Sequence, residues 1–249
     1  MKRTQLIQFL FLSVLIITPI QAVGQIIPKV TVGLEAAKDS KDVAVTLQIL
    51  FIMTILTLAP SILIMMTSFT RIVVIFSFLR RAIGTQSMPP NQTIIGLSLF
   101  LTLFIMMPVI TSINDSALQP YLADELDQKT ALKKAMHPLR EFMLKQTREK
   151  DIALFVRMTK LAQPRNVDDL PNTVVIPAFI ISELQTSFVI GFLLFIPFLV
   201  IDMIVSSVLM SMGMMMLPPV MISMPFKLVL FVLVDGWHLI TQQVVASFR

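Results

Sequence analysis

Long apolar runs on either side of one polar segment dominate the pattern of hydrophobic and polar positions along this chain. Apolar residues fill most of 44–113 and of 173–249, whereas residues 114–172 carry ten Lys or Arg and nine Asp or Glu. A helix needs about 20 mostly apolar residues to cross a bilayer. The pattern therefore predicts an all-α membrane protein, built from apolar helical hairpins broken by Pro and Gly, with a soluble mixed-charge helical segment between them.

The apolar runs predict two hairpins. The first, over 44–113, has a basic turn, and the second, over 173–249, has a Met-rich loop. A count of apolar windows gives four spans, near 46–66, 93–113, 184–206 and 217–240, and places both ends of the mature chain outside the cytoplasm.

The first 24 residues have the pattern of a secretory signal peptide. Lys2 and Arg3 precede an apolar run from Leu6 to Ile17, and small residues follow, so cleavage is expected after Ala22 or Gly24. A retained membrane anchor is the competing interpretation, but the run is short for a span. Residues 25–43 are polar and are expected to form an exported tail.

Residues 114–172 are expected to form two or three amphipathic helices on the exported, periplasmic side, since long loops cross the membrane largely regardless of charge. One apolar face is predicted before Pro138 and another after it. The first is formed by Leu122, Leu126, Leu132 and Met136, and the second begins with Leu139, Phe142 and Met143.

Three arginines, Arg71, Arg80 and Arg81, stand in the first apolar region with no acidic residue among them. Short loops rich in Arg and Lys stay in the cytoplasm. We therefore assign these arginines to a cytoplasmic basic turn.

Methionine is concentrated in the second hairpin, where eight of the chain's 18 fall within residues 203–224. An apolar helix reaches Gly213, passes Met214, Met215 and Met216, and is broken by Pro218 and Pro219, because helices do not run through paired prolines. Met side chains are unbranched and adaptable. The tip could form a compliant seal if several copies converge; the alternative is an ordinary tight turn beside a Met-rich core.

Four charged residues, Glu183, Asp202, Lys227 and Asp235, lie within or at the edges of the last two apolar runs. A charge facing lipid at the bilayer centre costs at least about 2.5 to 3.5 kcal/mol, so these side chains are expected to face protein. They could form ion pairs that fix register, with Lys227 meeting one of the acids, or a proton or ion pathway through Asp202 or Glu183. The available lysine favours the ion pairs.

Composition and motifs argue against several classes of function. The chain is 55% hydrophobic and 14% charged, and its net charge of +5 is divided between segments, so nucleic-acid binding is not expected. Cysteine is absent, and His137 and His238 stand in no metal-binding spacing. No phosphate-binding, dinucleotide or hydrolase motif occurs. We expect no enzyme activity, no cofactor and no metal.

Two blocks carry a close resemblance to the FliP/SctP family of type III export-gate subunits. They are MTSFTRIVVIFSFLRRAIGTQSMPPNQTIIGLSLFLT, residues 66–102, and IPAFIISELQTSFVIGFLLFIPFLVIDMIVSSVLMSMGMMMLPPVMISMPFKLVLFVLVDGWHLI, residues 176–240. Together they cover over two fifths of the chain.

The resemblance implies a ring subunit of the flagellar protein export gate in the bacterial inner membrane. It implies a homo-pentamer joined by FliQ and FliR, other export-apparatus membrane proteins as neighbours, and unfolded flagellar proteins as the exported substrates. It also implies a methionine gasket formed by Met214, Met215 and Met216. A secondary transporter or proton channel using Asp202 and Glu183 is the alternative, and a passive assembly scaffold is a third possibility.

Overall fold

Helices make up the regular structure of this chain. The computed structural model describes residues 40–249 except 86, 160–165, 167–168, 215 and 249, and no strand occurs among them. The all-α prediction is therefore confirmed. The chain divides into one unit ending at Leu50 and a second from Phe51 to Arg249. The expected signal peptide, 1–24, and most of the expected tail, 25–43, lie outside the described residues.

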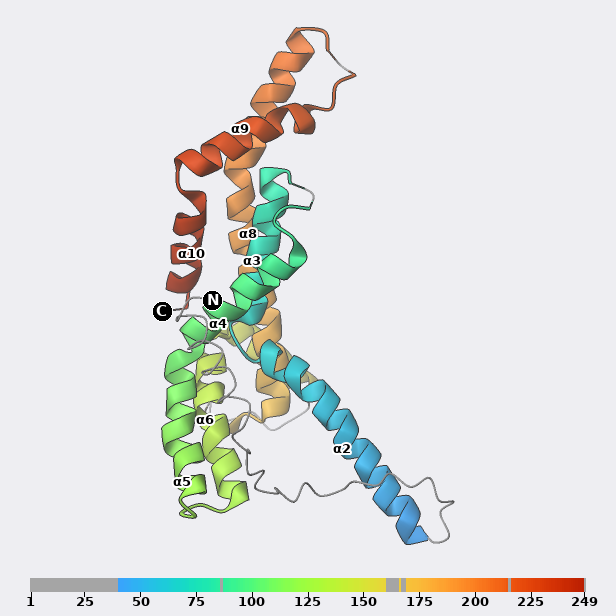
Figure 1. Cartoon of the computed structure of the whole chain (residues 1–249), viewed down its shortest axis with the longest axis vertical. Helices are drawn as coiled ribbons and strands as arrows, with labels where there is room; N and C mark the ends of the chain where they lie inside the picture. The colour runs from blue at the N-terminus through green and yellow to red at the C-terminus, as the bar shows by residue number, and fades with distance from the viewer. Residues whose placement is uncertain (1–39, 86, 160–165, 167–168, 215, 249) are drawn as a thin grey trace, which may run out of the picture. The chain divides into compact units, whose positions relative to one another are not determined.

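Ten helical elements follow one another (Figure 1) in the described ranges. They are α2 (Ser40–Met65), α3 (Phe69–Ile83), α4 (Asn91–Ile113), the π-helical turn η1 (Asn114–Leu118), α5 (Gln119–Leu122), α6 (Gln128–Gln146), α7 (Glu149–Met158), α8 (Asn172–Ser211), α9 (Pro219–Leu233) and α10 (Gly236–Ala246). Helix α2 begins in the first unit and continues into the second.

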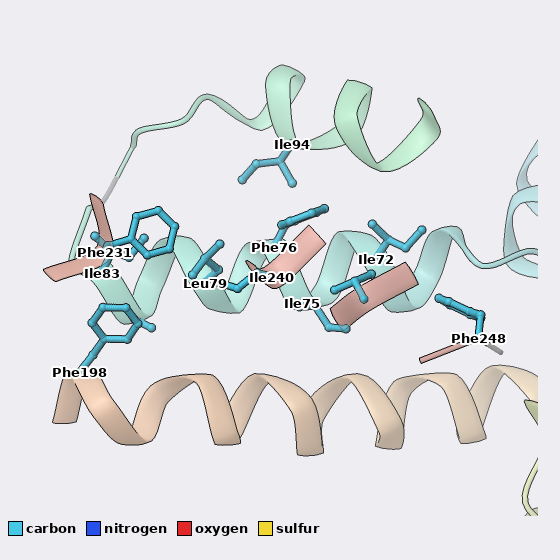
Figure 2. Packing of buried hydrophobic residues seen from close by; sticks show 12 residues of the cluster. Ile72, Ile75, Phe76, Leu79, Ile83, Ile94, Phe198, Phe231, Ile240 and Phe248 are labelled. Atoms are coloured by element: carbon cyan, nitrogen blue, oxygen red, sulfur yellow. The ribbon is translucent and has the colours of Figure 1, made fainter. Parts of the chain in front are cut away.

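Helix α3 lies at the centre of the main hydrophobic cluster. Its buried residues recur at the helical spacing of three and four, and Figure 2 shows Ile72, Ile75, Phe76, Leu79 and Ile83 along the length of the helix. Residues of α4, α8, α9, α10 and the chain end complete the cluster, with Ile94, Phe198, Phe231, Ile240, Val244 and Phe248 as its buried members there. The continuous apolar stripe of α3 thus holds the two hairpins together.

A second hydrophobic cluster joins the beginning of α8 to the polar segment. Val174, Val175 and Phe179 of α8 are fully buried beside Met143 of α6, and residues of α7 pack against them. The beginning of α8 is therefore part of the core that the mixed-charge segment builds.

Two helices are long and apolar enough to cross a membrane, at 32 residues for Asn91–Leu122 and 40 residues for Asn172–Ser211. The pair α9 and α10, bent by 67°, gives a third if it counts as one span. The described residues thus hold two or three candidate spans where the hydrophobic pattern predicted four. The fourth predicted window, 46–66, falls on α2, Ser40–Met65.

A helix break separates α2 from α3 within the apolar stretch, at the end of the span predicted near 46–66. Thr67 Oγ1 donates to Ile64 O at 2.7 Å and accepts from Phe69 N at 3.3 Å, so the hydroxyl bonds the backbone on both sides of the break. Ser and Thr side chains compete with helical hydrogen bonding in this way. This local competition accompanies the end of α2 at Met65, and α3 begins at Phe69 and packs on α8.

Helix α6 continues through Pro138, where the sequence predicts a boundary between two apolar faces. The proline is buried, and α6 packs against α4, η1 and α8. Packing on three neighbours offsets the cost of a proline inside a helix, about 3 kcal/mol. The predicted four-residue face before Pro138 is also wrong, because Leu122 ends α5, Leu126 lies in the loop, and Leu132 of α6 is 66% exposed.

Candidate functional site

The hairpin of α8 and α9 extends past the end of α3 (Figure 1). Helix α3 ends at Ile83, and there Lys227 Nζ of α9 donates a 3.4 Å hydrogen bond to Ala82 O. Beyond this level α8 and α9 face each other across an apolar groove. The groove is lined by Ile201, Ile204, Val205, Val208, Leu209, Ile222 and Phe226.

The tip of the hairpin begins with a glycine-capped helix end. Gly213 has φ +77°, and its N–H donates to Met210 O at 3.0 Å, while Met214 N–H donates to Leu209 O at 3.0 Å. These two bonds form a Schellman cap, which needs a left-handed residue after the helix. Pro218 then caps α9, and Pro219 occupies its first position, where a missing N–H costs nothing. The hairpin breakers Gly213, Pro218 and Pro219 thus set where the tip lies.

Methionines at and beside the tip are exposed in the single chain. Met216 is 98% exposed, Met212 is 63% exposed and Met214 is 36% exposed. Met215 lies outside the described residues. So much exposed apolar surface at one end of a hairpin points to a contact that one chain does not supply.

A charged cluster holds the two helices in register at the base of this tip. Lys227 Nζ lies 2.6 Å from Asp202 Oδ2, and Ser223 Oγ donates to Asp202 Oδ1 at 2.5 Å. The Lys227 side chain is 4% exposed and that of Asp202 is 24% exposed. Together with the bond to Ala82 O, the cluster joins α3, α8 and α9.

Glu183 pairs with Arg71, which the sequence predicts to lie in a cytoplasmic basic turn. The guanidinium of Arg71 is bidentate on the carboxylate, with Nε to Oε2 at 2.9 Å and Nη2 to Oε1. The same guanidinium donates to Ser247 O at 2.8 Å and to Gln146 Oε1 at 3.1 Å. It also lies 3.9 Å from the centre of the Phe248 ring. Arg71 therefore ties α3 to α8, to α6 and to the end of the chain.

The structure also departs from the sequence prediction at the basic turn and at Asp235. Arg71 is buried in the first turn of α3, so it does not share a turn with Arg80 and Arg81 in the last turn. Arg80 Nη1 donates to Asn91 Oδ1 at 2.7 Å and to Pro89 O at 3.2 Å, while Arg81 is exposed. Asp235, expected to be buried, is exposed in this chain, at φ +50° between α9 and α10.

A polar cluster that sequence reasoning missed attaches α7 to α8. Ser182 Oγ donates to Asp151 Oδ2 at 2.5 Å, and Arg148 Nε donates to the same oxygen at 2.8 Å. Burial disfavours the carboxylate, but the hydrogen bonds from Ser182 and Arg148 and the guanidinium charge outweigh it, so the pKa of Asp151 lies below its ordinary value. Nothing in the local sequence distinguishes this aspartate from its exposed neighbours.

Asp151→Asn is expected to lower the free energy of unfolding at neutral pH by about 1.5 kcal/mol, the usual size for a hydrogen bond to a charged group. Because the pKa is lower in the folded state, the carboxylate stabilises the fold above its ordinary pKa, and this stabilisation is lost as the pH falls through the lowered value. Unfolding in detergent at neutral pH and at about pH 3 measures the difference.

The matched control is Glu149→Gln, an exposed carboxylate in the same first turn of α7. It should change stability by less than about 0.5 kcal/mol at either pH. Equal effects from the two variants would show that Asp151 acts only through the helix dipole.

No group of three or more His, Asp or Glu side chains within the described ranges is placed to hold a metal ion. Four of the charged side chains of the apolar helices instead form the two ion pairs described above.

Comparison with known proteins gives one consistent family. The FliP family model matches residues 52–244. A relative from Bacillus subtilis (strain 168) is 54% identical over 217 residues, covering 87% of this chain and 98% of the relative. One from Pectobacterium carotovorum is 51% identical over 203 residues, covering 82% and 79%. One from Caulobacter vibrioides is 48% identical over 249 residues, covering 100% and 92%. Each is named flagellar biosynthetic protein FliP.

Proposed function

This chain belongs to the FliP family, and from that premise we propose that it is a subunit of the flagellar type III protein export gate. In this proposal several copies surround a pore through which unfolded flagellar proteins leave the cytoplasm. The hairpin tips, with Met214, Met215 and Met216, meet at the axis and form the gasket that closes the pore at rest.

The observation that carries the proposal is the exposed methionine tip beyond the end of α3. A membrane protein that buried its hairpin tips within its own fold would leave no such surface. Here Met216 is 98% exposed and the adjoining groove between α8 and α9 is wholly apolar. Converging copies would bury these side chains against one another, which gives each tip the contact that one chain lacks.

Methionine suits a seal that must open for side chains of any size. Its thioether chain adopts many shapes, so a ring of such chains can fill an irregular gap. Each atom contact contributes only about 0.1 to 0.2 kcal/mol, so a passing chain can separate the contacts one at a time. A ring of rigid side chains would leave gaps at rest or resist the substrate.

The proposal assigns partners and a location as well. We place five copies with FliQ and FliR in the bacterial inner membrane, with residues 1–24 removed as a signal peptide. The turn bearing Arg80 and Arg81 is then cytoplasmic, and residues 114–172 lie on the periplasmic side. The long apolar helices support a membrane location, and the excess of arginine in the turn supports its orientation.

A secondary transporter or proton channel is less well supported. Such a protein would use Asp202 or Glu183 to bind its ion, but each of these carboxylates is held by a cation of its own chain. One pair joins α3 of the first hairpin to α8 of the second, and the other joins α8 to α9 within the second hairpin. Both therefore favour a role in holding the fold.

Replacement of Met214, Met215 and Met216 together by Ala tests the gasket. The complex should still assemble, since none of the described tip residues contributes to either core cluster. The inner membrane should become permeable to small solutes, measured as growth inhibition by a normally excluded solute or as dye uptake. Native mass measurement of the purified complex shows whether it has assembled.

The matched control is the triple replacement of Met203, Met210 and Met221 by Ala. These methionines lie on the same hairpin and are 69%, 59% and 70% exposed, but they are on the helices and not in the tip. This control should keep the membrane tight. An assembled complex with a tight membrane after loss of the three tip methionines would remove the gasket role.

A further inference from the structure

The charges on the apolar helices do not all find partners within the chain. In the described parts of α3, α4, α8, α9 and α10, with their caps, the Asp, Glu, Lys and Arg residues are Arg71, Arg80, Arg81, Glu183, Asp202, Lys227 and Asp235. Two ion pairs use four of them, and Arg80 donates hydrogen bonds to Pro89 O and Asn91 Oδ1 after α3. One exposed cation, Arg81, and one exposed anion, Asp235, remain.

Asp235 stands in surroundings that do not suit a bare carboxylate. It separates α9 from α10 in the bent pair that forms the third candidate span. Its neighbours Leu233, Val234 and Trp237 are 78%, 48% and 41% exposed, so most of the surface next to it in the chain is apolar, with His238 as the exposed polar neighbour. A charge in such a segment needs a partner of opposite sign or water.

The backbone at this position does not require the charge. Asp235 has φ +50° and ψ +52°, a left-handed conformation that asparagine adopts as readily as aspartate. Its side chain also makes no capping hydrogen bond to α10. The bend alone therefore leaves the negative charge unexplained.

Arg81 and Asp235 both lie near the contact between α3 and α9, where Lys227 Nζ donates to Ala82 O. Phe231, one turn before Asp235, packs in the cluster that contains Ile83 of α3, and Figure 2 shows the two side chains next to each other. Arg81 is in the last turn of α3, two residues before Ile83. One exposed positive charge, on α3, and one exposed negative charge, between α9 and α10, thus stand on elements that pack against each other.

We propose that Asp235 of one copy of this chain forms an ion pair with Arg81 of the neighbouring copy. The inference rests on the proposed assembly of several identical copies. Contacts between two different patches of one chain generate rings or helical arrays, whereas a two-fold contact uses one patch twice. Opposite charges at two different places on the chain fit the first kind of contact. The pair would set the order of copies around the ring and remove an uncompensated carboxylate from an apolar surface.

Charge variants of the full complex give the first test. Asp235→Asn and Arg81→Gln are each expected to reduce the recovered oligomer at least tenfold, because each leaves its partner unpaired in the interface. The double variant should be no worse than either single variant, since both changes remove the same interaction. Asp235→Arg should assemble least, and Arg81→Asp combined with Asp235→Arg should restore assembly.

Asp124→Asn is the matched control. Asp124 is also exposed and also left-handed, with φ +57°, but it follows α5 in the polar segment. Its replacement should leave the oligomer unchanged. The proposal is overturned if Asp235→Asn leaves assembly unchanged. It is also overturned if Arg81→Asp combined with Asp235→Arg yields no more oligomer than Asp235→Arg alone.

Cross-linking gives a test that does not depend on stability, because the chain has no cysteine. Chains with Arg81→Cys and chains with Asp235→Cys are produced together, and a short reagent that joins two thiols is added to the assembled complex. A linked dimer that needs both variants supports the pair. Asp124→Cys in place of Asp235→Cys should give no such dimer.

These outcomes separate this inference from the proposed function. If the unmodified chain is monomeric when purified with its sister proteins, the proposed gate fails, and the ion pair fails with it. If the unmodified chain forms its oligomer, but the thiols do not cross-link and the charge exchange does not restore assembly, only the proposed ion pair is overturned. Asp235 would then meet a cation of another protein or water.

Discussion

Glu183→Gln is expected to lower the free energy of unfolding by about 3 to 5 kcal/mol, the cost of removing one partner of a buried ion pair. Arg71 is 2% exposed and Glu183 is fully buried, so the guanidinium left behind has no access to water. Glutamine keeps the shape of the side chain, which makes the lost charge the main cause. The midpoint of thermal unfolding of the full chain in detergent measures the effect.

Two further variants make this result specific. Glu141→Gln, an exposed residue of α6, should change stability by less than about 0.5 kcal/mol. Arg71→Met combined with Glu183→Met should recover much of the loss, because an apolar pair leaves no buried charge. If Glu183→Gln behaves like the Glu141 control, water reaches the ion pair and the burial argument is wrong.

Gly236→Ala is the second change for which we expect a large effect, a loss of about 1 to 3 kcal/mol from overpacking. A Cβ at this position would lie 2.2 Å from Cε2 of the Phe231 ring. Phe231 is 5% exposed, and its ring packs edge-on against the Trp237 ring with 5.4 Å between the ring centroids. The Phe231 ring therefore has little room to turn away. The methyl group should force α9 and α10 apart at their bend, and the same unfolding measurement reports the loss.

Gly96→Ala provides the comparison, because a Cβ there meets no atom within 4 Å. Gly96 lies inside α4, where alanine stabilises a helix by up to about 1 kcal/mol relative to glycine. The two Gly-to-Ala changes should therefore act in opposite directions. In the Gly236→Ala background, Phe231→Leu should recover part of the stability, and equal losses in all variants would contradict a clash with the ring.

The family and the all-α fold were accessible from the sequence because they depend on long patterns. Apolar runs of span length predict helices in a membrane, and the resemblance to the export-gate family covers two separate blocks. Both expectations are confirmed, the family by the match over residues 52–244 and the fold by the helices. The turn at Gly213 and Pro218 was predictable as well, since paired prolines stop a helix wherever they occur.

The ends of helices and the ion-pair partners inside the fold were harder to predict. The break after Met65 involves the hydroxyl of Thr67, which looks like any threonine in an apolar run. The passage of α6 through Pro138 depends on its packing against α4 and α8. Arg71 was assigned to a basic turn with Arg80 and Arg81 because no acidic residue stands among the three, whereas its partner Glu183 is 112 residues away.

By itself, the sequence determined the helical membrane class, the family and the position of the methionine loop. Each of these follows from residues close together along the chain, through apolar content, proline chemistry and local similarity. Only the tertiary structure decided which charges are neutralised. Arg71 meets Glu183 and Lys227 meets Asp202, while Asp235 and Arg81 are left exposed. The physical reason is that an ion pair depends on distance in space, and packing brings together residues that sequence separation keeps far apart.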